Sequence, residues 1–218
     1  MKVIYTAIFG EGYELRQPAH AAEGWTYVCV TDREDIKDGG VYRISRTPRA
    51  EYPKLASRQM KIVSGMMFMN LFQGVLPEVS VYHDSRFVAP ADPEQFVAGL
   101  PSVDVVVMEH NKRKTIEQEA QHVIEKGIDT REAVQETLDR LFLLGFDTKS
   151  VKLGLYAPGV MVRRYTSAAV GAFEMAWFKL VSHGSARDQL TLPAVLCKSG
   201  VRFATVPFKQ TYDLWMGR

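Results

Sequence analysis

Strand-length hydrophobic runs alternate along this chain with segments of helical periodicity. The runs are rich in β-branched and aromatic residues and lack a polar face, which is typical of strands buried on both sides in a parallel sheet. We expect strands over residues 3–9, 27–32, 41–44, 80–84, 103–108, 156–164 (entered through a turn) and 201–206. We expect helices over residues 54–72, 93–100, 115–125, 131–144, 167–183 and 187–198, followed by a polar aromatic tail.

Residue types at the expected helix starts support this pattern. Pro93 suits a first helical turn, and Thr115, Thr130 and Ser185 suit N-caps. The methionines within residues 54–72 are interpreted as part of the core. Strands that alternate with helices predict a single α/β domain over residues 1–218, with a mixed, mostly parallel central sheet flanked by helices.

Composition adds few constraints. A chain of 218 residues with 46% hydrophobic residues and a formal charge of +2 is an ordinary globular protein, for which nucleic acid is neither required nor excluded. Cys29 and Cys197 lie in apolar runs and are predicted to be buried and unpaired. The first hydrophobic run is too short to span a bilayer, so we expect no membrane span and a cytoplasmic location.

Polar groups stand at the ends of several expected strands. Asp32 and Asp84 each close an apolar run, and Glu109 and His110 close another. Ligands of open α/β sheets bind beyond the carboxyl ends of the strands, so we expect these groups to converge on one site. The basic residues that we expect to meet phosphate there are Arg58, Lys61 and Arg86. A second polar cluster covers residues 185–190.

Familiar catalytic motifs are missing from the sequence. It contains no Walker sequence, no nucleophile elbow and no metalloprotease motif, which disfavours the usual phosphoryl-transfer loop and serine hydrolysis.

Several motifs together resemble one known family over nearly the whole length. The matching stretches are residues 3–10 with Tyr13, 29–32, 54–61, 81–86, 92–93, 109–113, 117–120, 158–164, 177–178 and 187–190. In order and spacing they are similar to the glycosyltransferase-like domain of the plant mucilage and turgor proteins. The resemblance implies a GT-A, Rossmann-like fold and a glycosyltransferase that uses a nucleotide sugar, with a uridine diphosphate sugar as the expected donor.

The resemblance also implies roles for individual residues. Asp84 takes the place of the first acid of an Asp-x-Asp metal motif, and Arg187-Asp188-Gln189 takes the place of a sugar-facing motif. The implied donor-binding residues are Thr6, Ala7, Ile8, Phe9, Asp32, Arg58, Lys61, Asp84, Arg86 and Arg163. The implied catalytic residues are Asp188, as the base or as the group that orients the sugar, with Arg187, Gln189 and His110.

A departure from the metal motif leaves the cofactor open. Arg86 occupies the third motif position, where an acid would complete a site for Mn²⁺ or Mg²⁺. Asp84, with His83 or His110, is then a small ligand set for a hard cation. Arg86 could instead neutralise the leaving diphosphate directly.

The acceptor and the class of activity stay open as well. The acceptor could be a glycan, such as a surface polysaccharide of a bacterium, or a hydroxymethylated DNA base as in phage DNA modification. The chain could bind a nucleotide sugar without transferring it, or hydrolyse a lipid or sugar phosphate. Asp188 could serve a helix start and His110 a hydrogen bond. The sugar, the stereochemical outcome and the oligomeric state are not determined by the sequence.

Overall fold

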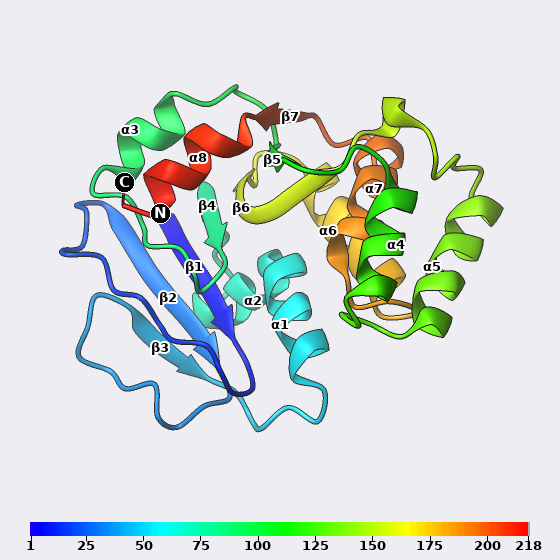
Figure 1. Ribbon diagram of the computed structural model, residues 1–218. Helices are drawn as coiled ribbons and strands as arrows, with labels where there is room; N and C mark the ends of the chain where they lie inside the picture. Colours follow the sequence, from blue (N-terminus) through cyan, green and yellow to red (C-terminus); the bar gives the residue numbers. More distant parts are fainter. Residues whose placement is uncertain (218) are drawn as a thin grey trace.

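A seven-stranded sheet with the order β3-β2-β1-β4-β6-β5-β7 organises the computed structural model, which describes residues 1–217 (Figure 1). The pairs β1–β2, β1–β4, β2–β3 and β5–β7 are parallel, whereas β6 runs antiparallel to both β4 and β5. The predicted α/β class with a mixed, mostly parallel sheet is therefore confirmed. The strands are β1 Lys2–Ile8, β2 Trp25–Thr31, β3 Arg43–Arg46, β4 Val79–His83, β5 Val105–Glu109, β6 Tyr156–Arg164 and β7 Phe203–Val206.

Helices cover both faces of the sheet. Alternate residues of β1 divide between two cores: Val3 and Tyr5 pack on the side of α1, α2 and α6, and Ile4 and Ile8 pack on the opposite side. A third cluster lies among α4, α5 and α7. The helices are α1 Pro53–Ile62, α2 Ser64–Leu71, α3 Pro93–Ala98, α4 Ile116–Glu125, α5 Arg131–Leu143, α6 Ala168–Val181, α7 Leu192–Lys198 and α8 Phe208–Trp215, with 3₁₀ turns η1 Val151–Leu153 and η2 Asp188–Leu190.

Two predicted helices are interrupted in the structure. The helix expected over residues 54–72 is divided at Val63, which has φ −95° and ψ 47°. Met66 and Met69 on α2 are 53% and 41% exposed, so their assignment to the core was wrong. The helix expected over residues 187–198 is a 3₁₀ turn followed by α7, and Arg187, not Ser185, is the N-cap of the 3₁₀ turn. The hydroxyl of Ser185 accepts from the amide of Arg187 and donates to Asp129.

The remaining differences are at strand and chain ends. The third strand lies two residues later than predicted, over Arg43–Arg46. Cys29 is buried as expected, but Cys197 is exposed, and both thiols are free. Within residues 1–217, no helix combines the length and the apolar character that crossing a membrane requires.

The predicted polar aromatic tail is a packed helix, α8. The indole of Trp215 is fully buried and lies 5.4 Å, between ring centroids, from both His83 and Phe96. The backbone carbonyl of Trp215 accepts a hydrogen bond from the amide of Val88. The end of the chain therefore closes the core next to the strand that leads to Asp84.

We expect Trp215→Ala to lower the free energy of unfolding by about 3–5 kcal/mol, because it empties a closely packed site. The matched variant Leu214→Ala removes a side chain that is 43% exposed and should change stability by less than about 1 kcal/mol. Urea denaturation, monitored by circular dichroism, measures the free energy of unfolding of both variants. Similar losses of stability in the two variants would show that α8 is not part of the core.

Candidate functional site

A pocket opens where β1 and β2 end. Asp32 binds both of its walls, because one carboxylate oxygen accepts from the amide of Gly10 at 3.2 Å and the other from the amide of Ala50 at 3.1 Å. Gly10 has φ +69°, and a Cβ there would lie 3.0 Å from Pro53, so only glycine suits this turn. The pocket has a volume of about 500 Å³ and is lined by Gly10, Asp32, Arg49, Ala50, Glu51 and Pro53.

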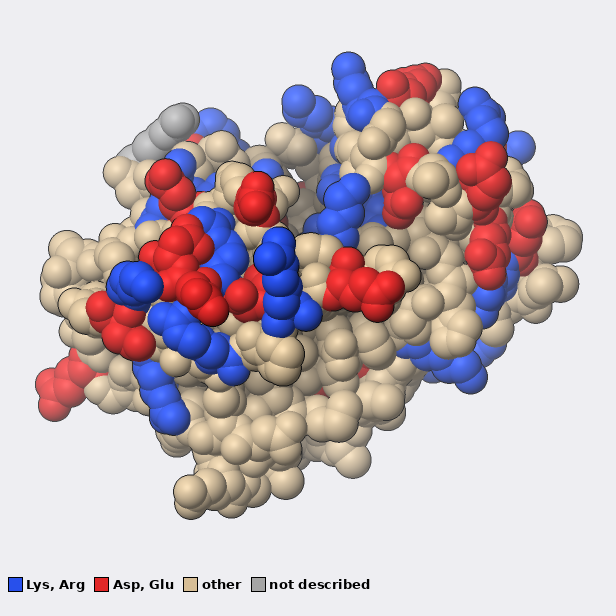
Figure 2. All heavy atoms as spheres, turned by 90° about the horizontal axis from the view of Figure 1, so that it is seen from below, with Lys and Arg blue, Asp and Glu red and all other residues tan. Residues whose placement is uncertain are grey.

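The surface around these strand ends carries many charged side chains of both signs. The lower side of Figure 1, toward which the arrows of β1, β2 and β4 point, faces the viewer in Figure 2. Lys and Arg alternate there with Asp and Glu, and basic side chains border a hollow between the two halves of the molecule. This edge therefore has a surface of mixed charge, with basic side chains at the hollow.

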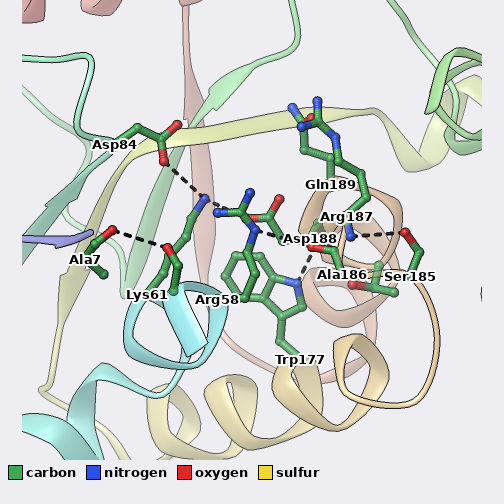
Figure 3. A network of polar contacts seen from close by, with 12 residues as sticks. Ala7, Arg58, Lys61, Asp84, Trp177, Ser185, Ala186, Arg187, Asp188 and Gln189 are labelled. Carbon is green, nitrogen blue, oxygen red and sulfur yellow. Dashed lines mark hydrogen bonds and ion pairs between the residues drawn. The ribbon is translucent and has the colours of Figure 1, made fainter. Parts of the chain in front are cut away.

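Asp188 is the centre of a buried charge cluster drawn from distant parts of the chain (Figure 3). Its carboxylate lies 2.6 Å from the Nζ of Lys61 and 3.6 Å from the Nε of Arg58, both on α1. Trp177 supports the turn from beneath, since its indole nitrogen donates to the Asp188 carbonyl. The Asp188 and Lys61 side chains are 3% and 2% exposed, and Arg58 is 25% exposed. Arg58 thus connects the buried ion pair to the surface.

Asp84, just beyond β4, faces the same cluster. Its Oδ1 accepts a hydrogen bond from the hydroxyl of Tyr82 at 2.9 Å and lies 3.9 Å from the Nζ of Lys61. Its Oδ2 lies 3.3 Å from the guanidinium of Arg86. The Asp84 side chain is 28% exposed, so this carboxylate stands between two cations and also meets solvent.

These residues do not fit a divalent cation held by the protein alone. Mg²⁺ and Mn²⁺ favour several oxygen ligands, but Asp84 is flanked by Lys61 and Arg86. His83 is buried, with Nε2 2.6 Å from the Tyr42 hydroxyl and Nδ1 3.1 Å from the Asp84 carbonyl, which corrects its assignment as a metal ligand. Within residues 1–217, no three His, Cys, Asp or Glu side chains are arranged around a possible metal position.

The charge state of Asp188 limits its role. Burial by itself would raise the pKa of Asp188, but Arg58 and Lys61 outweigh burial and hold that pKa well below its usual range. A general base works best with a pKa near the working pH, and a carboxylate of such low proton affinity does not. The geometry therefore favours Asp188 as the group that orients Lys61 and Arg58.

A second charge cluster surrounds Glu119 on α4. Its two carboxylate oxygens accept from the Nε of Arg187, at 2.8 Å, and from the Nε of Arg113. Burial would raise the pKa of Glu119, but Arg187 and Arg113 hold it below the usual range. His110 lies 3.7 Å from Glu119, and its Nδ1 accepts from the amides of Lys112 and Arg113. With these bonds His110 shapes the turn before α4, and its catalytic role stays a prediction.

A buried network behind Lys61 fixes the end of α1. Arg163 and the hydroxyl of Tyr5 both donate to the carbonyl oxygen of Lys61, each at 2.9 Å. The Nε of Arg163 lies 3.3 Å from the carboxylate of Glu174, and neither side chain is more than 2% exposed. Arg163 therefore cannot contact a donor, and its predicted role is corrected to support of the backbone beneath Lys61.

The other predicted residues divide into those near the site and those in the core. Arg58, Lys61, Asp84, Asp188 and Arg86 come together as the sequence predicts. The side chains of Thr6, Ile8 and Phe9 are buried in the sheet, so only their backbone is available to a donor, and their part in donor binding stays a prediction. Ala7 is also buried, and its carbonyl accepts from the hydroxyl of Ser57 on α1. Gln189 is buried next to Asp188, and its Nε2 donates to the Tyr156 carbonyl.

Three residues of the two charge clusters, Tyr82, Arg113 and Glu119, were not predicted from the sequence. A signal for Glu119 was present, because it stands with Ile116, Ala120 and Val123 on the buried face of α4. A charged residue on the apolar stripe of a helix requires partners of opposite charge.

No protein-family model and no curated protein sequence matches this chain. Among solved structures, the 4-diphosphocytidyl-2C-methyl-D-erythritol synthase of Anaerococcus prevotii is similar over 94% of this chain and 88% of its own, with 12% identity and a TM-score of 0.46. Mouse xyloside xylosyltransferase 1 is similar over 99% of this chain and 92% of its own, with 9% identity and a TM-score of 0.40. At these scores neither likeness assigns a function to this chain.

We expect Asp188→Ala to lower the free energy of unfolding by about 3–5 kcal/mol, because it leaves Lys61 charged and buried without its nearest partner. The double variant Lys61→Met, Asp188→Ala should recover much of that loss. The matched control is Glu136→Ala, which breaks the exposed pair with Arg140 and should cost less than about 1 kcal/mol. Urea denaturation measures the free energy of unfolding of all three variants. An Asp188→Ala variant as stable as the wild type would contradict the stabilising role of the buried ion pair.

Stability should also fall below neutral pH because of His83. Burial lowers the pKa of His83 to about 4, whereas an unfolded chain restores a value of about 6.5. The full stability is therefore present above pH 6.5 and is lost as the pH falls toward 4, by up to about 3 kcal/mol. Denaturation midpoints between pH 7.5 and 4.5 measure this slope, which should be shallower in His83→Gln and unchanged in a variant of the exposed His20.

Proposed function

We propose that this protein is a glycosyltransferase that takes its sugar from a nucleotide sugar, with a uridine diphosphate sugar as donor. The observation that carries the proposal is the cluster of Arg58, Lys61 and Asp188 beside Asp84, at the strand ends of a Rossmann-like sheet. This edge is where open α/β sheets bind their ligands. The resemblance of the sequence motifs to a glycosyltransferase-like family supports the same conclusion.

The proposed donor extends across two adjoining parts of the site. The nucleoside occupies the pocket of about 500 Å³ next to Asp32, whose carboxylate holds the two loops that line the pocket. The diphosphate meets the guanidinium groups of Arg58 and Arg86, which are 25% and 58% exposed. Asp188 neutralises Lys61, so the positive charge offered to the diphosphate comes from Arg58 and Arg86.

In the proposed reaction, the bond between the anomeric carbon and the diphosphate oxygen breaks, and an acceptor hydroxyl oxygen forms a new bond to that carbon. The O–H bond of the acceptor breaks at the same time, and its proton passes to the leaving diphosphate or to solvent. The electron pair of the broken bond leaves with the nucleoside diphosphate, which gains negative charge. Fixed cations aimed at such a developing charge lower the barrier. Arg58 and Arg86 supply this stabilisation, so we propose that the protein does not require Mn²⁺ or Mg²⁺ for donor binding.

The proposed acceptor is a hydroxyl of a glycan, and a hydroxymethylated DNA base is the second candidate acceptor. Release of the sugar without any acceptor would instead indicate a hydrolase of a sugar or lipid phosphate. Binding of the donor without turnover would indicate a nucleotide-sugar-binding protein that lacks transfer activity.

A thermal-shift panel of nucleotides and nucleotide sugars, each with manganese or with EDTA, tests the donor. Ligand at a hundredfold excess over Kd should stabilise the folded state by about 2.7 kcal/mol. We expect uridine diphosphate and its sugars to raise the melting temperature equally with and without manganese. Arg86→Gln should weaken this binding about tenfold, because it removes a charged hydrogen-bond donor, whereas Arg131→Gln on the surface of α5 should not.

Two results would contradict the proposal. A panel in which no nucleotide stabilises the protein would remove the donor site. An Asp84→Asn variant that folds normally and retains full transfer activity would separate the charge cluster from the chemistry. Stabilisation only in the presence of manganese would replace the arginine mechanism by a metal-dependent one.

A further inference from the structure

The cluster around Glu119 carries more positive charge than its position in the fold requires. One buried carboxylate faces two guanidinium groups, and burial lowers the pKa of His110 to about 4, so that this imidazole is neutral at neutral pH. The cluster therefore has a net charge of about +1 at the surface beside Asp188. One arginine would have been sufficient to neutralise the carboxylate of Glu119.

Both arginines keep donors free for a ligand. Arg187 uses its Nε for Glu119, and Arg113 uses its Nε for Glu119 and its Nη2 for His110. Among residues 1–217, the Nη1 of Arg113 and the two terminal nitrogens of Arg187 find no hydrogen-bond partner. The two side chains are 17% and 24% exposed, so solvent reaches them. Because both bind the same carboxylate, the two side chains are held next to each other.

Gln189 gives a second indication of a ligand at this place. It is only 6% exposed, and its Oε1 is a buried acceptor without a hydrogen-bond partner among the described residues. A buried polar atom without a partner is costly unless a ligand or water satisfies it. Gln189 follows Asp188 directly, and Figure 3 shows Arg187 and Gln189 beyond Asp188, on the side away from Trp177.

We propose that Arg113, Arg187 and Gln189 form a binding site for an anionic group, a carboxylate or phosphate monoester, of a hydroxylated acceptor. The paired guanidinium groups bind the anion, and the amide oxygen of Gln189 accepts from a neighbouring hydroxyl. The site lies on the α4 side of η2, whereas Arg58, Lys61 and the Asp32 pocket lie on the α1 side. An acid sugar bound there would present a hydroxyl beside Asp188, opposite the donor. The role of this ligand as the acceptor rests on the proposed function, whereas the binding of an anion does not.

Thermal-shift titrations with glucuronate and glucose 6-phosphate, against glucose as the uncharged control, test this site. Both anions should stabilise the wild-type protein, and glucose should not. Arg113→Gln should raise the Kd of the anions about tenfold or more, because it removes one charged donor. Arg113→Lys should restore part of the affinity, and Lys112→Gln, an exposed neighbour, should leave it unchanged. Equal anion binding by wild type and Arg113→Gln would overturn the proposal, as would no binding to wild type.

Arginine modification of the wild-type protein tests the same site without a folding risk. Glucuronate should slow the reaction of Arg113 and Arg187 with phenylglyoxal, measured by mass spectrometry, but not that of the exposed Arg131. Unchanged rates at Arg113 and Arg187 would overturn the proposal.

The donor panel separates this inference from the proposed function. Uridine diphosphate should bind Arg113→Gln as tightly as the wild type, and weaker binding would assign the arginines to the donor diphosphate and overturn the acceptor site. Anion binding in a protein that binds no nucleotide would uphold the anion site while the proposed function fails.

Discussion

The buried ion pair between Lys61 and Asp188 is the constraint on which the rest of the site depends. Two charges with almost no solvent contact are stable only with close partners, and here each partner fixes the position of the other. Lys61 is also held through its backbone by Arg163 and Tyr5, so it is determined at both ends. The pair also helps to position two neighbours, because Arg58 lies within 4 Å of Asp188 and Asp84 lies within 4 Å of Lys61.

The sheet explains why polar groups gather at one edge. Parallel strands β1, β2 and β4 end together, and their following residues include Asp32 and Asp84. The antiparallel strand β6 inserts between β4 and β5 and brings Arg163 across the sheet to the end of α1. The fold thus separates two tasks: strand ends present charge to the ligand, and β6 supplies the buried network that supports it.

Strand ends and helix starts were predictable from the sequence because they depend on local patterns. Asp84 closes an apolar run, and Thr115 and Thr130 cap their helices with hydrogen bonds to the backbone three residues on. The division at Val63 was not predictable, since the apolar periodicity continues through it. The packing of α8 was also missed, because its few apolar residues find their core only through contacts with distant strands.

The candidate site was predicted in part for the same reason. Asp188 and Arg58 carry visible chemistry, but nothing local shows that they are 3.6 Å apart. Thr6, Ile8 and Phe9 follow a strand pattern that equally suits a ligand contact or a core, and the structure places their side chains in the core. Glu119 is the clearest case of a charge whose meaning appears only when its partners from other elements are known.

The distance along the chain between Lys61 and Asp188 has a consequence for synthesis. The two residues are 127 positions apart, so a growing chain contains the lysine long before its carboxylate partner. Contacts of such long range form late, since a large loop must close first. An N-terminal fragment that includes α1 but not η2 therefore leaves Lys61 without its carboxylate partner, on a helix whose inner face is open to chaperones and proteases. The ion pair that organises the finished site can therefore form only after η2 has been synthesised.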